Sequence, residues 1–320
     1  MRKSFVTGGA GFIGSHLVRK LLTLGHCVTV FDNFSNGHRW HFESDINNRN
    51  LNIIECDIAQ FDELTLALKG QDQVFHLASN ADISKAIAEP NIDFTNGTVL
   101  TKNILEAMRI NEIKKIFYTS GSGVYGEVPS TPIPENYSDM LPISTYGAQK
   151  LASESLISAY SYMFGITGTV FRFANVVGPR QTHGVIYDFV KKLFRNNRSL
   201  EILGDGSQSK PYIYVDDVIS AFVLAEKEFH NGYQFFNVAS DDLMTVNQIA
   251  DLICQLMNLK NVNYLYTGGS RGWLADVPFY RLDTSKIKKF GWKNQSNSYE
   301  AVTKAIQSII LDVENGNIKI

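Results

Sequence analysis

Short apolar runs recur along the first half of the chain and alternate with longer stretches of helical periodicity. Apolar runs bounded by turn residues are typical of buried strands. The pattern predicts strands at Lys3–Thr7, His26–Asp32, Leu51–Glu55, Gln73–Leu77, Lys115–Thr119 and Thr167–Phe173. It predicts helices from about Ser15 to Leu24, Gly97 to Asn111 and Gly147 to Phe164. Strands that alternate with helices indicate an α/β fold with a mostly parallel, doubly wound sheet.

The pattern changes after Gly178, where loops rich in Gly, Asn and Ser separate shorter helical stretches. Helices are predicted at Ile186–Asn196, Asp216–Glu226, Val246–Leu256 and Tyr299–Glu314. Thr245 and Gln248 fit a capping box at the start of the third. We therefore expect two parts, the parallel-sheet domain over 1–178 and a smaller C-terminal α/β lobe over 179–320, with elements that cross between them.

Composition narrows the class of protein. The chain has 320 residues, 44% of them hydrophobic, which is enough for a sizeable core. A net charge of −2 argues against a general nucleic-acid binder. The three cysteines are widely spaced, so we expect no disulfide. No histidine pairs with Cys, Asp or another His at ligand spacing in a suitable element, and His38-x-x-His41 lies in a polar loop where solvation is expected, so we expect no metal. No signal peptide or membrane-length apolar run is found, which predicts a cytoplasmic protein without membrane contact.

A glycine-rich turn follows the first predicted strand. Gly9, Gly11 and Gly14 match G-x-G-x-x-G, and Gly8 with Gly11 and Gly14 matches G-x-x-G-x-x-G. Glycines here permit a tight turn and let backbone N–H groups approach a pyrophosphate. Asp32 closes the next strand, where a carboxylate binds the adenosine ribose and repels a 2′-phosphate. The combination predicts a Rossmann-type dinucleotide site that favours NAD over NADP.

Tyr146 and Lys150 lie four residues apart in S144-TYGAQK-L151, so a helix places both side chains on one face. An ammonium beside a phenol favours the phenolate nearer neutral pH. Such a base can take the proton from a sugar hydroxyl while hydride leaves for a nicotinamide. Y-x-x-x-K alone also fits a surface lysine beside a half-buried tyrosine, so the nucleotide motif decides between these interpretations.

These motifs, in this order, resemble the extended short-chain dehydrogenase/reductase family. The segments that carry the resemblance are T7-GGAGFIG-S15, D32-NFS, D57-I58, V124-YG, Tyr146-x-x-x-Lys150, F173-ANVVGP, G204-DG-x-Q and Y214-VDD. Within the family the chain is similar to the nucleotide-sugar epimerases of the UDP-glucose 4-epimerase type. The resemblance implies NAD as cofactor, a nucleotide-diphosphate sugar as substrate, and a homodimer built from the 97–111 helix and the Tyr/Lys helix. Leu100, Ile104, Leu151 and Leu156 are then either core or interface residues.

The resemblance also implies a mechanism. Tyr146 removes the 4-hydroxyl proton as hydride passes to NAD⁺, and the 4-keto sugar turns over and takes the hydride back. Lys150 binds the nicotinamide ribose and lowers the pKa of Tyr146. The implied cofactor-binding residues are Gly8, Gly11, Phe12, Ile13, Gly14, Asp32, Asn33, Asp57, Ile58, Leu77, Ala78, Asn96, Ser120, Tyr146, Lys150 and Phe173. The implied substrate-binding residues are Asn175, Lys210, Arg271 and Tyr280.

Three positions depart from the family pattern. Gly121 stands where the family usually has the Ser or Thr that shares the transferred proton. Ser122 or Ser120 would be a displaced helper, with Ser122 favoured, or both would be structural residues of a glycine-rich turn. Lys210 replaces the usual arginine and loses its bidentate geometry. The segment W273-LAD lacks the arginine that the family has at this position. Arg271, two residues earlier, either reaches the diphosphate from its own position or lies at the surface.

The loop before V124-YG also bears on the reaction. Dehydrating relatives carry Asp-Glu after the catalytic Thr, and decarboxylating relatives usually carry a Glu there, whereas this chain has Ser122-Gly123. Their absence favours 4-epimerisation. A 4,6-dehydratase, another sugar-nucleotide dehydrogenase or reductase, and a non-catalytic NAD-binding protein stay open. A tyrosine at 280 suggests hexoses without an N-acetyl group at C2, or else an ordinary packed aromatic.

Overall fold

The computed structural model describes residues 1–80, 83–129 and 132–320 of the chain. It divides into two compact units. The first contains Met1–Tyr125, Met140–Arg172 and Ile219–Phe236, and the second contains Gly126–Asp139, Phe173–Val218 and Asn237–Ile320. The sequence predicted a boundary after residue 178 with elements that cross it, and 219–236, from beyond that boundary, supplies a helix and a strand to the first unit.

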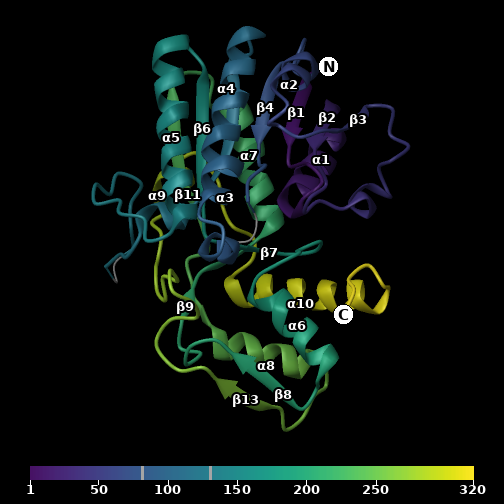
Figure 1. Ribbon diagram of the computed structural model, residues 1–320, viewed down its shortest axis with the longest axis vertical. Coiled ribbons are helices and arrows are strands. Elements are labelled where there is room, and N and C mark those ends of the chain that lie inside the picture. The colour runs from purple at the N-terminus through teal and green to yellow at the C-terminus, as the bar shows by residue number, and fades with distance from the viewer. Residues whose placement is uncertain (81–82, 130–131) are drawn as a thin grey trace. The chain divides into compact units, whose positions relative to one another are not determined.

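The first unit is built on a seven-stranded parallel sheet in the order β11-β6-β5-β4-β1-β2-β3, which confirms the predicted fold class (Figure 1). The strands are β1 (Lys3–Thr7), β2 (Cys27–Asp32), β3 (Leu51–Glu55), β4 (Gln73–His76), β5 (Lys115–Gly121), β6 (Thr167–Phe173) and β11 (Tyr233–Val238). Of these, β1, β3 and β6 match the predicted ranges residue for residue. The edge strand β11 was not predicted.

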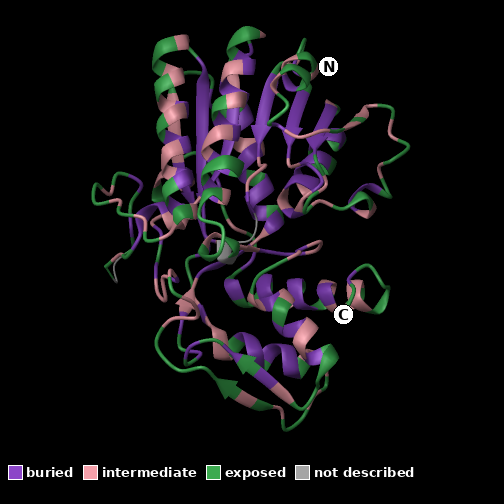
Figure 2. Cartoon of the chain, viewed as in Figure 1, coloured by how far each residue is buried: buried purple, intermediate pink, exposed green. Residues whose placement is uncertain are grey.

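Helices cover both faces of this sheet. They are α1 (Phe12–Thr23), α2 (Phe61–Ala67), α3 (Asn91–Asp93), the π-helical η3 (Phe94–Val99), α4 (Leu100–Ile110), α5 (Thr145–Phe164) and α7 (Val215–Glu228). Successive side chains of a strand point to opposite faces. On β4, Phe75 contacts Phe222 of α7, whereas His76 bonds to Thr101 of α4. Hence α4 and α7 lie on opposite faces, and the strands between them are buried (Figure 2). Leu100 and Ile104, which were open between core and interface, lie in the core.

The ends of α5 follow from its sequence. The Ser144 side chain caps the helix by accepting a hydrogen bond from the Gly147 N–H at 3.0 Å. The helix ends at Gly165, whose φ of +66° suits a residue without a Cβ. Gly147 lets α5 approach the loop after β5, because a Cβ there would lie 2.3 Å from the Gly123 carbonyl oxygen.

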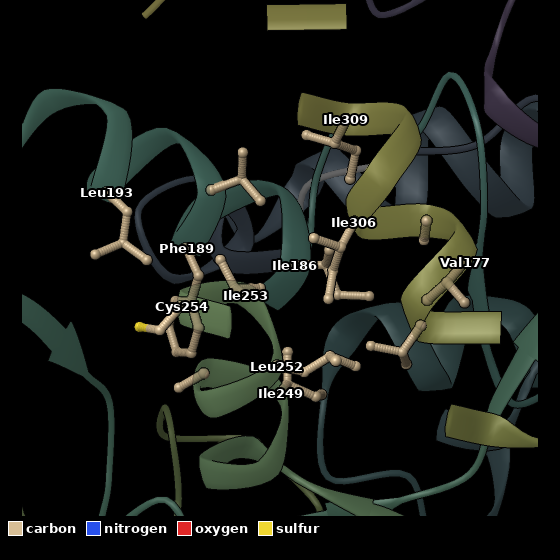
Figure 3. Close-up of a cluster of buried hydrophobic side chains, with 14 of the residues drawn as sticks. Val177, Ile186, Phe189, Leu193, Ile249, Leu252, Ile253, Cys254, Ile306 and Ile309 are labelled. Atoms are coloured by element: carbon tan, nitrogen blue, oxygen red, sulfur yellow. The ribbon is translucent and has the colours of Figure 1, made fainter. Parts of the chain in front are cut away.

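The second unit combines short strand pairs with a helical core. The strand pairs are β7 (Asn175–Val177) with β10 (Tyr212–Tyr214), β8 (Ser199–Ile202) with β13 (Asn263–Tyr266), and β9 (Ser209–Lys210) with β12 (Met244–Thr245). The main helices are α6 (Val185–Arg195), α8 (Val246–Leu256) and α10 (Ser298–Glu314), and α9 (Ser285–Lys288) is short. Figure 3 shows apolar side chains of α6, α8 and α10 meeting in one core. The predicted capping box at Thr245 and Gln248 is present. In the described part of the chain, no helix is both long and apolar enough to cross a membrane.

Candidate active site

The glycine turn after β1 is tightly packed against its neighbours. Gly8 has a φ of +67°, and a Cβ on it would lie 2.7 Å from the Ala78 nitrogen at the end of β4. A Cβ on Gly14 would lie 2.1 Å from the Gly8 carbonyl oxygen. The first N–H groups of a helix lack intrahelical acceptors, and they attract an anion. At the start of α1 these groups belong to the predicted residues Phe12 and Ile13, so the turn fits a pyrophosphate.

The predicted adenosine-binding residues lie at the ends of β2 and β3. Asp32 is 8% exposed, and its carboxylate accepts hydrogen bonds from the backbone N–H groups of Ala10 and Phe34, both at 2.9 Å. Burial raises the pKa of Asp32, and these two hydrogen bonds oppose the rise. The Asn33 amide donates to Asp57 at 2.7 Å. Each oxygen of Asp32 keeps a second lone pair, so the cluster fits a ribose that donates hydroxyl groups.

The other predicted cofactor residues differ in their surroundings. Leu77 and Ala78 follow β4, where the Leu77 N–H donates to the Thr7 carbonyl at 3.2 Å. Ile58 is 4% exposed and packs in the core of the first unit. Asn96 is exposed on the π-helical segment, and Phe173 is the buried last residue of β6. Contact of these residues with a cofactor stays a prediction.

Tyr146 and Lys150 share one face of α5, one turn apart. Lys150 is 3% exposed, and its Nζ donates to the Thr119 carbonyl at 2.8 Å. The same nitrogen lies 5.0 Å from the ring centre of Tyr118 and 5.5 Å from that of Tyr146. The helix thus delivers a buried ammonium to the face of the tyrosine ring.

The protein environment acts on the two groups in opposite directions. Burial raises the pKa of Tyr146 to about 12, and the Asp93 carboxylate adds to the rise. Burial lowers the pKa of Lys150 to about 7, against the carboxylates of Glu154 and Asp93. The resemblance implied a lowered pKa for Tyr146, and the protein alone does the opposite. The reason is that desolvation penalises the phenolate and the added carboxylate repels it.

The two serines beside Gly121 have different roles. Ser120, at the end of β5, is 4% exposed, and its hydroxyl donates to Glu154. Ser122 begins the 3₁₀ turn Ser122–Tyr125 and is half-buried. Its hydroxyl forms no hydrogen bond with any residue that the structure describes. Of the two, Ser122 is therefore the one whose hydroxyl can turn to another group, and its part in catalysis stays a prediction.

Beneath this loop lies a buried ion pair that sequence reasoning missed. Arg172 and Glu154 are each 3% exposed in their side chains and meet at 2.6 Å. Arg172 also donates to the Tyr125 hydroxyl at 2.9 Å. The pair therefore holds both ends of the turn that contains Gly121, through Ser120 and Tyr125. The available signal was the place of Glu154, four residues after Lys150 and so on the same helix face.

A buried polar chain connects the glycine turn with α5. His76 is fully buried, with Nδ1 2.7 Å from the Thr7 hydroxyl and Nε2 3.1 Å from the Thr101 hydroxyl. The Thr101 hydroxyl lies 3.0 Å from that of Ser153 on α5. Burial lowers the pKa of His76 to about 3, and nearby Lys150 contributes. His76 is therefore a neutral residue of β4 that links β1, through Thr7, to α4, through Thr101.

The second unit contains the predicted substrate-binding residues. Tyr280 is 5% exposed, and its hydroxyl donates to the Asn175 side chain at 3.2 Å. Lys210 forms an ion pair with Asp276, and Arg271 forms one with Glu127. Arg271 also donates to the Asp276 carbonyl at 2.8 Å. The structure thus brings both predicted cations to the same aspartate, and it gives each a carboxylate partner.

Comparison with known proteins identifies the family. Residues 4–239 match the NAD dependent epimerase/dehydratase family. A putative UDP-glucose 4-epimerase of Methanocaldococcus jannaschii is 32% identical over 94% of this chain and 96% of its own. A UDP-N-acetyl-alpha-D-glucosaminuronate decarboxylase of Bacillus cytotoxicus is 30% identical over 98% and 99% of the two chains. A crystal structure of a UDP-galactose 4-epimerase superimposes with a TM-score of 0.87, at 36% identity, over 97% and 99% of the two chains. The chain belongs to the NAD-dependent epimerase/dehydratase family of nucleotide-sugar enzymes, which confirms NAD as its cofactor.

Proposed function

We propose that this chain is an NAD-dependent nucleotide-sugar 4-epimerase that interconverts UDP-glucose and UDP-galactose. The observation that carries the proposal is the placement of Tyr146 and Lys150 on one face of α5, with the ammonium nitrogen 5.5 Å from the centre of the phenol ring. The 4-epimerase relatives reported above support the substrate class.

Epimerisation at C4 removes a hydride from the carbon and a proton from its hydroxyl, and then returns both. Bound NAD⁺ supplies the hydride acceptor and a positive charge that opposes the raised pKa of Tyr146. Tyr146 takes the proton from the 4-hydroxyl and gives it back to the same oxygen after the 4-keto sugar has turned over. Lys150 binds the nicotinamide ribose, and its ammonium favours the phenolate. Ser122 is the hydroxyl that shares the proton in place of the residue missing at Gly121.

Epimerisation is favoured over the other reactions of the family by the loop from Ser120 to Gly123, which contains no carboxylate. Dehydration needs an acid and a base to expel water across C5 and C6. Glu154 accepts a hydrogen bond from Ser120 of this loop, and its ion pair with Arg172 withholds it from proton transfer. Decarboxylation remains the second candidate, because a decarboxylase is similar along almost the whole chain.

In the second unit, Lys210 and Arg271 are proposed to hold the substrate's diphosphate after exchanging their carboxylate partners for it. An ammonium binds phosphate as a point charge and lacks the fork of a guanidinium. Asn175 is proposed to bind a substrate phosphate, and Tyr280 to limit the space at C2 of the sugar. The buried hydroxyl of Tyr280, bonded to Asn175, supports a fixed position for this ring.

We also propose a homodimer formed through α4 and α5. Supporting this, Tyr162 and Met163 of α5 are 96% and 72% exposed, and Ile110 of α4 is 49% exposed. Their burial in a helical interface would remove apolar surface from water. Light scattering on the purified protein gives the mass, and a monomer at micromolar concentration would reject this part of the proposal.

The test of function is a product analysis by mass. Purified protein with NAD⁺ is incubated with UDP-glucose, UDP-galactose and their N-acetyl forms, and the products are separated and weighed. We expect an equal-mass isomer from both hexoses. Tyr146→Phe should give none, whereas Tyr299→Phe, a matched change at a tyrosine of α10 that is 53% exposed, should behave as wild type.

Other outcomes identify other functions. A product lighter by one water would identify a dehydratase, and loss of carbon dioxide from a uronate would identify a decarboxylase. NAD binding without any product from UDP-, GDP-, CDP- or dTDP-sugars would identify a binding protein. Equal turnover by Tyr146→Phe and wild type would reject the mechanism even if the isomer forms.

A further inference from the structure

Asp93 is a buried carboxylate that the mechanism above does not use. It ends α3 and is 1% exposed. One of its oxygens accepts a hydrogen bond from the Asn80 amide at 2.9 Å, and the other accepts one from the Thr145 hydroxyl at 2.7 Å. Among the described residues, both side chains that donate to Asp93 are neutral. Burying a carboxylate costs free energy, which hydrogen bonds to neutral donors compensate less fully than a cation does.

The hydrogen bond from Thr145 gives Asp93 a mechanical link to the site. Thr145 is the first residue of α5 and directly precedes Tyr146. The Ser144 cap ties this turn only to α5 itself. Asp93 ties it to α3 and, through Asn80, to the segment that follows β4. Asp93 therefore fixes the first turn of α5, whereas Lys150 and Ser153 hold the later turns through Thr119 and Thr101.

We propose that Asp93 is a positioning residue for the 4-epimerase reaction, an inference that rests on the function proposed above. Its carboxylate anchors the first turn of α5 through Thr145 and places a negative charge beside Tyr146 and Lys150. The charge favours the ammonium form of Lys150, which must be protonated to stabilise a phenolate, and in the protein without cofactor it also favours the neutral phenol of Tyr146.

Three neutral side chains surround Lys150, two from the strands β4 and β5 and one from α5 itself. On β4, His76 is neutral because burial lowers its pKa to about 3. On β5, the ring of Tyr118 lies under the ammonium, and burial raises the pKa of its hydroxyl, which keeps it neutral. Tyr146 precedes Lys150 by one turn of α5, and burial raises its pKa to about 12, so it is neutral as well.

Two carboxylates act on the same ammonium. Both Glu154, one turn later on α5, and Asp93 raise the pKa of Lys150, against the larger effect of burial. Glu154 is paired with Arg172, so most of its charge is compensated. Asp93 has no such cation among its described hydrogen-bond partners. Glu154 has the larger effect of the two, but its removal would also leave the charge of Arg172 unpaired, so Asp93 is the carboxylate whose removal tests the titration of Lys150 without disturbing a second charge.

The test measures that titration without substrate or cofactor. Protein labelled with ¹³C at the lysine ε-carbon is titrated by NMR, and the Lys150 signal is assigned by its loss in Lys150→Met. Removing a nearby charge shifts a pKa by about one pH unit or more. We expect the Lys150 midpoint to fall by about one pH unit in Asp93→Asn and to stay unchanged in Glu89→Gln, an exposed carboxylate in the turn before α3. An unchanged midpoint in folded Asp93→Asn would overturn the proposal.

Thr145→Val tests the mechanical link separately, because it keeps the charge and removes the hydrogen bond. We expect a tenfold or greater fall in kcat, with the Lys150 midpoint and KM near their wild-type values. A wild-type kcat in Thr145→Val would reject the anchoring role. This result does not depend on whether Asp93→Asn folds. If the wild-type protein epimerises no sugar nucleotide, the proposed function fails, while the Lys150 titration still decides whether Asp93 sets the charge of the pair.

Discussion

The cations proposed to act in catalysis and in substrate binding have different partners in the two units. In the first unit, the Lys150 ammonium is 3% exposed and donates to a backbone carbonyl. No carboxylate of the residues that the structure describes is in hydrogen-bond contact with it. In the second unit, Lys210 and Arg271 each form an ion pair with a carboxylate. A lysine that burial brings to a pKa of about 7 can change its charge near neutral pH, which suits proton chemistry. A cation held by a carboxylate can exchange that partner for another anion, which suits the binding of a diphosphate.

The largest expected effect lies at the tyrosine of the first unit. Tyr146→Phe removes the hydroxyl, the only group of this side chain that can donate or accept a proton. General acid–base catalysis contributes about 10²–10⁴-fold to a rate, so we expect kcat to fall by at least about 100-fold. NAD binding, measured by calorimetry, should stay unchanged because the ring remains. A fall in NAD affinity as large as the fall in kcat would mean that the residue binds the cofactor and is not the base.

The ion pairs of the two units should differ in what they contribute to stability. Removing one partner of a buried pair leaves an uncompensated charge, which costs about 3–5 kcal/mol. An exposed pair contributes about 0–1 kcal/mol. We therefore expect Glu154→Gln to lower the free energy of unfolding by several kcal/mol and Glu127→Gln, whose side chain is 60% exposed, to change it little.

Urea unfolding followed by circular dichroism measures both free energies. Equal losses for the two variants would contradict the contrast between the units. A loss in Glu154→Gln that Arg172→Met in the same chain restores would show that the unpaired charge, and no other contact, is responsible.

His76 should make the stability of the first unit depend on pH. Its pKa is about 3 in the folded protein and about 6.5 ordinarily, so between these values the unfolded chain binds more protons than the folded one. The folded state therefore loses stability as the pH falls through this window, by about 1.4 kcal/mol for each pH unit. His76→Gln, which can still bond to Thr7 and Thr101, should show a shallower slope in unfolding free energy between pH 4 and 6. Parallel slopes would mean that His76 titrates as it does in water.

The smallest expected effect concerns the cations of the second unit. Lys210→Gln keeps a hydrogen-bond donor for Asp276 and removes the charge. A hydrogen bond to a charged group contributes about 1.5–3 kcal/mol, so KM for the sugar nucleotide should rise about tenfold or more, with kcat nearly unchanged. Lys192→Gln, at the ion pair with Glu201 in the same unit, is the control and should leave KM unchanged. A change in kcat alone would show that Lys210 does not act through binding.

The parts of the fold that the sequence predicted are those with local causes. The strands β1, β3 and β6 are apolar runs between turn residues, and the capping box at Thr245 needs only residues three apart. The glycine turn, Asp32 and the pair on α5 were likewise found from short spacings. Each of these features is decided within about twenty residues, and the structure contains all of them.

The parts that were missed depend on contacts between distant residues. β11 joins the sheet beside β6, although about sixty residues separate them in sequence. Arg172 meets Glu154 across two elements, and Asp93 receives its hydrogen bond from Thr145, 52 positions later. The raised pKa of Tyr146 had the same origin, because it comes from burial and from Asp93, and neither can be read from the spacing to Lys150.

The close packing of the glycine turn has a consequence for the history of such chains. At Gly14 a methyl group would meet the Gly8 carbonyl at 2.1 Å, and at Gly147 one would meet the Gly123 carbonyl at 2.3 Å, with no ligand involved. Folding alone therefore preserves these glycines. A descendant that no longer bound a cofactor would therefore still keep these glycines. Their presence alone indicates a shared backbone structure and does not demonstrate enzymatic activity.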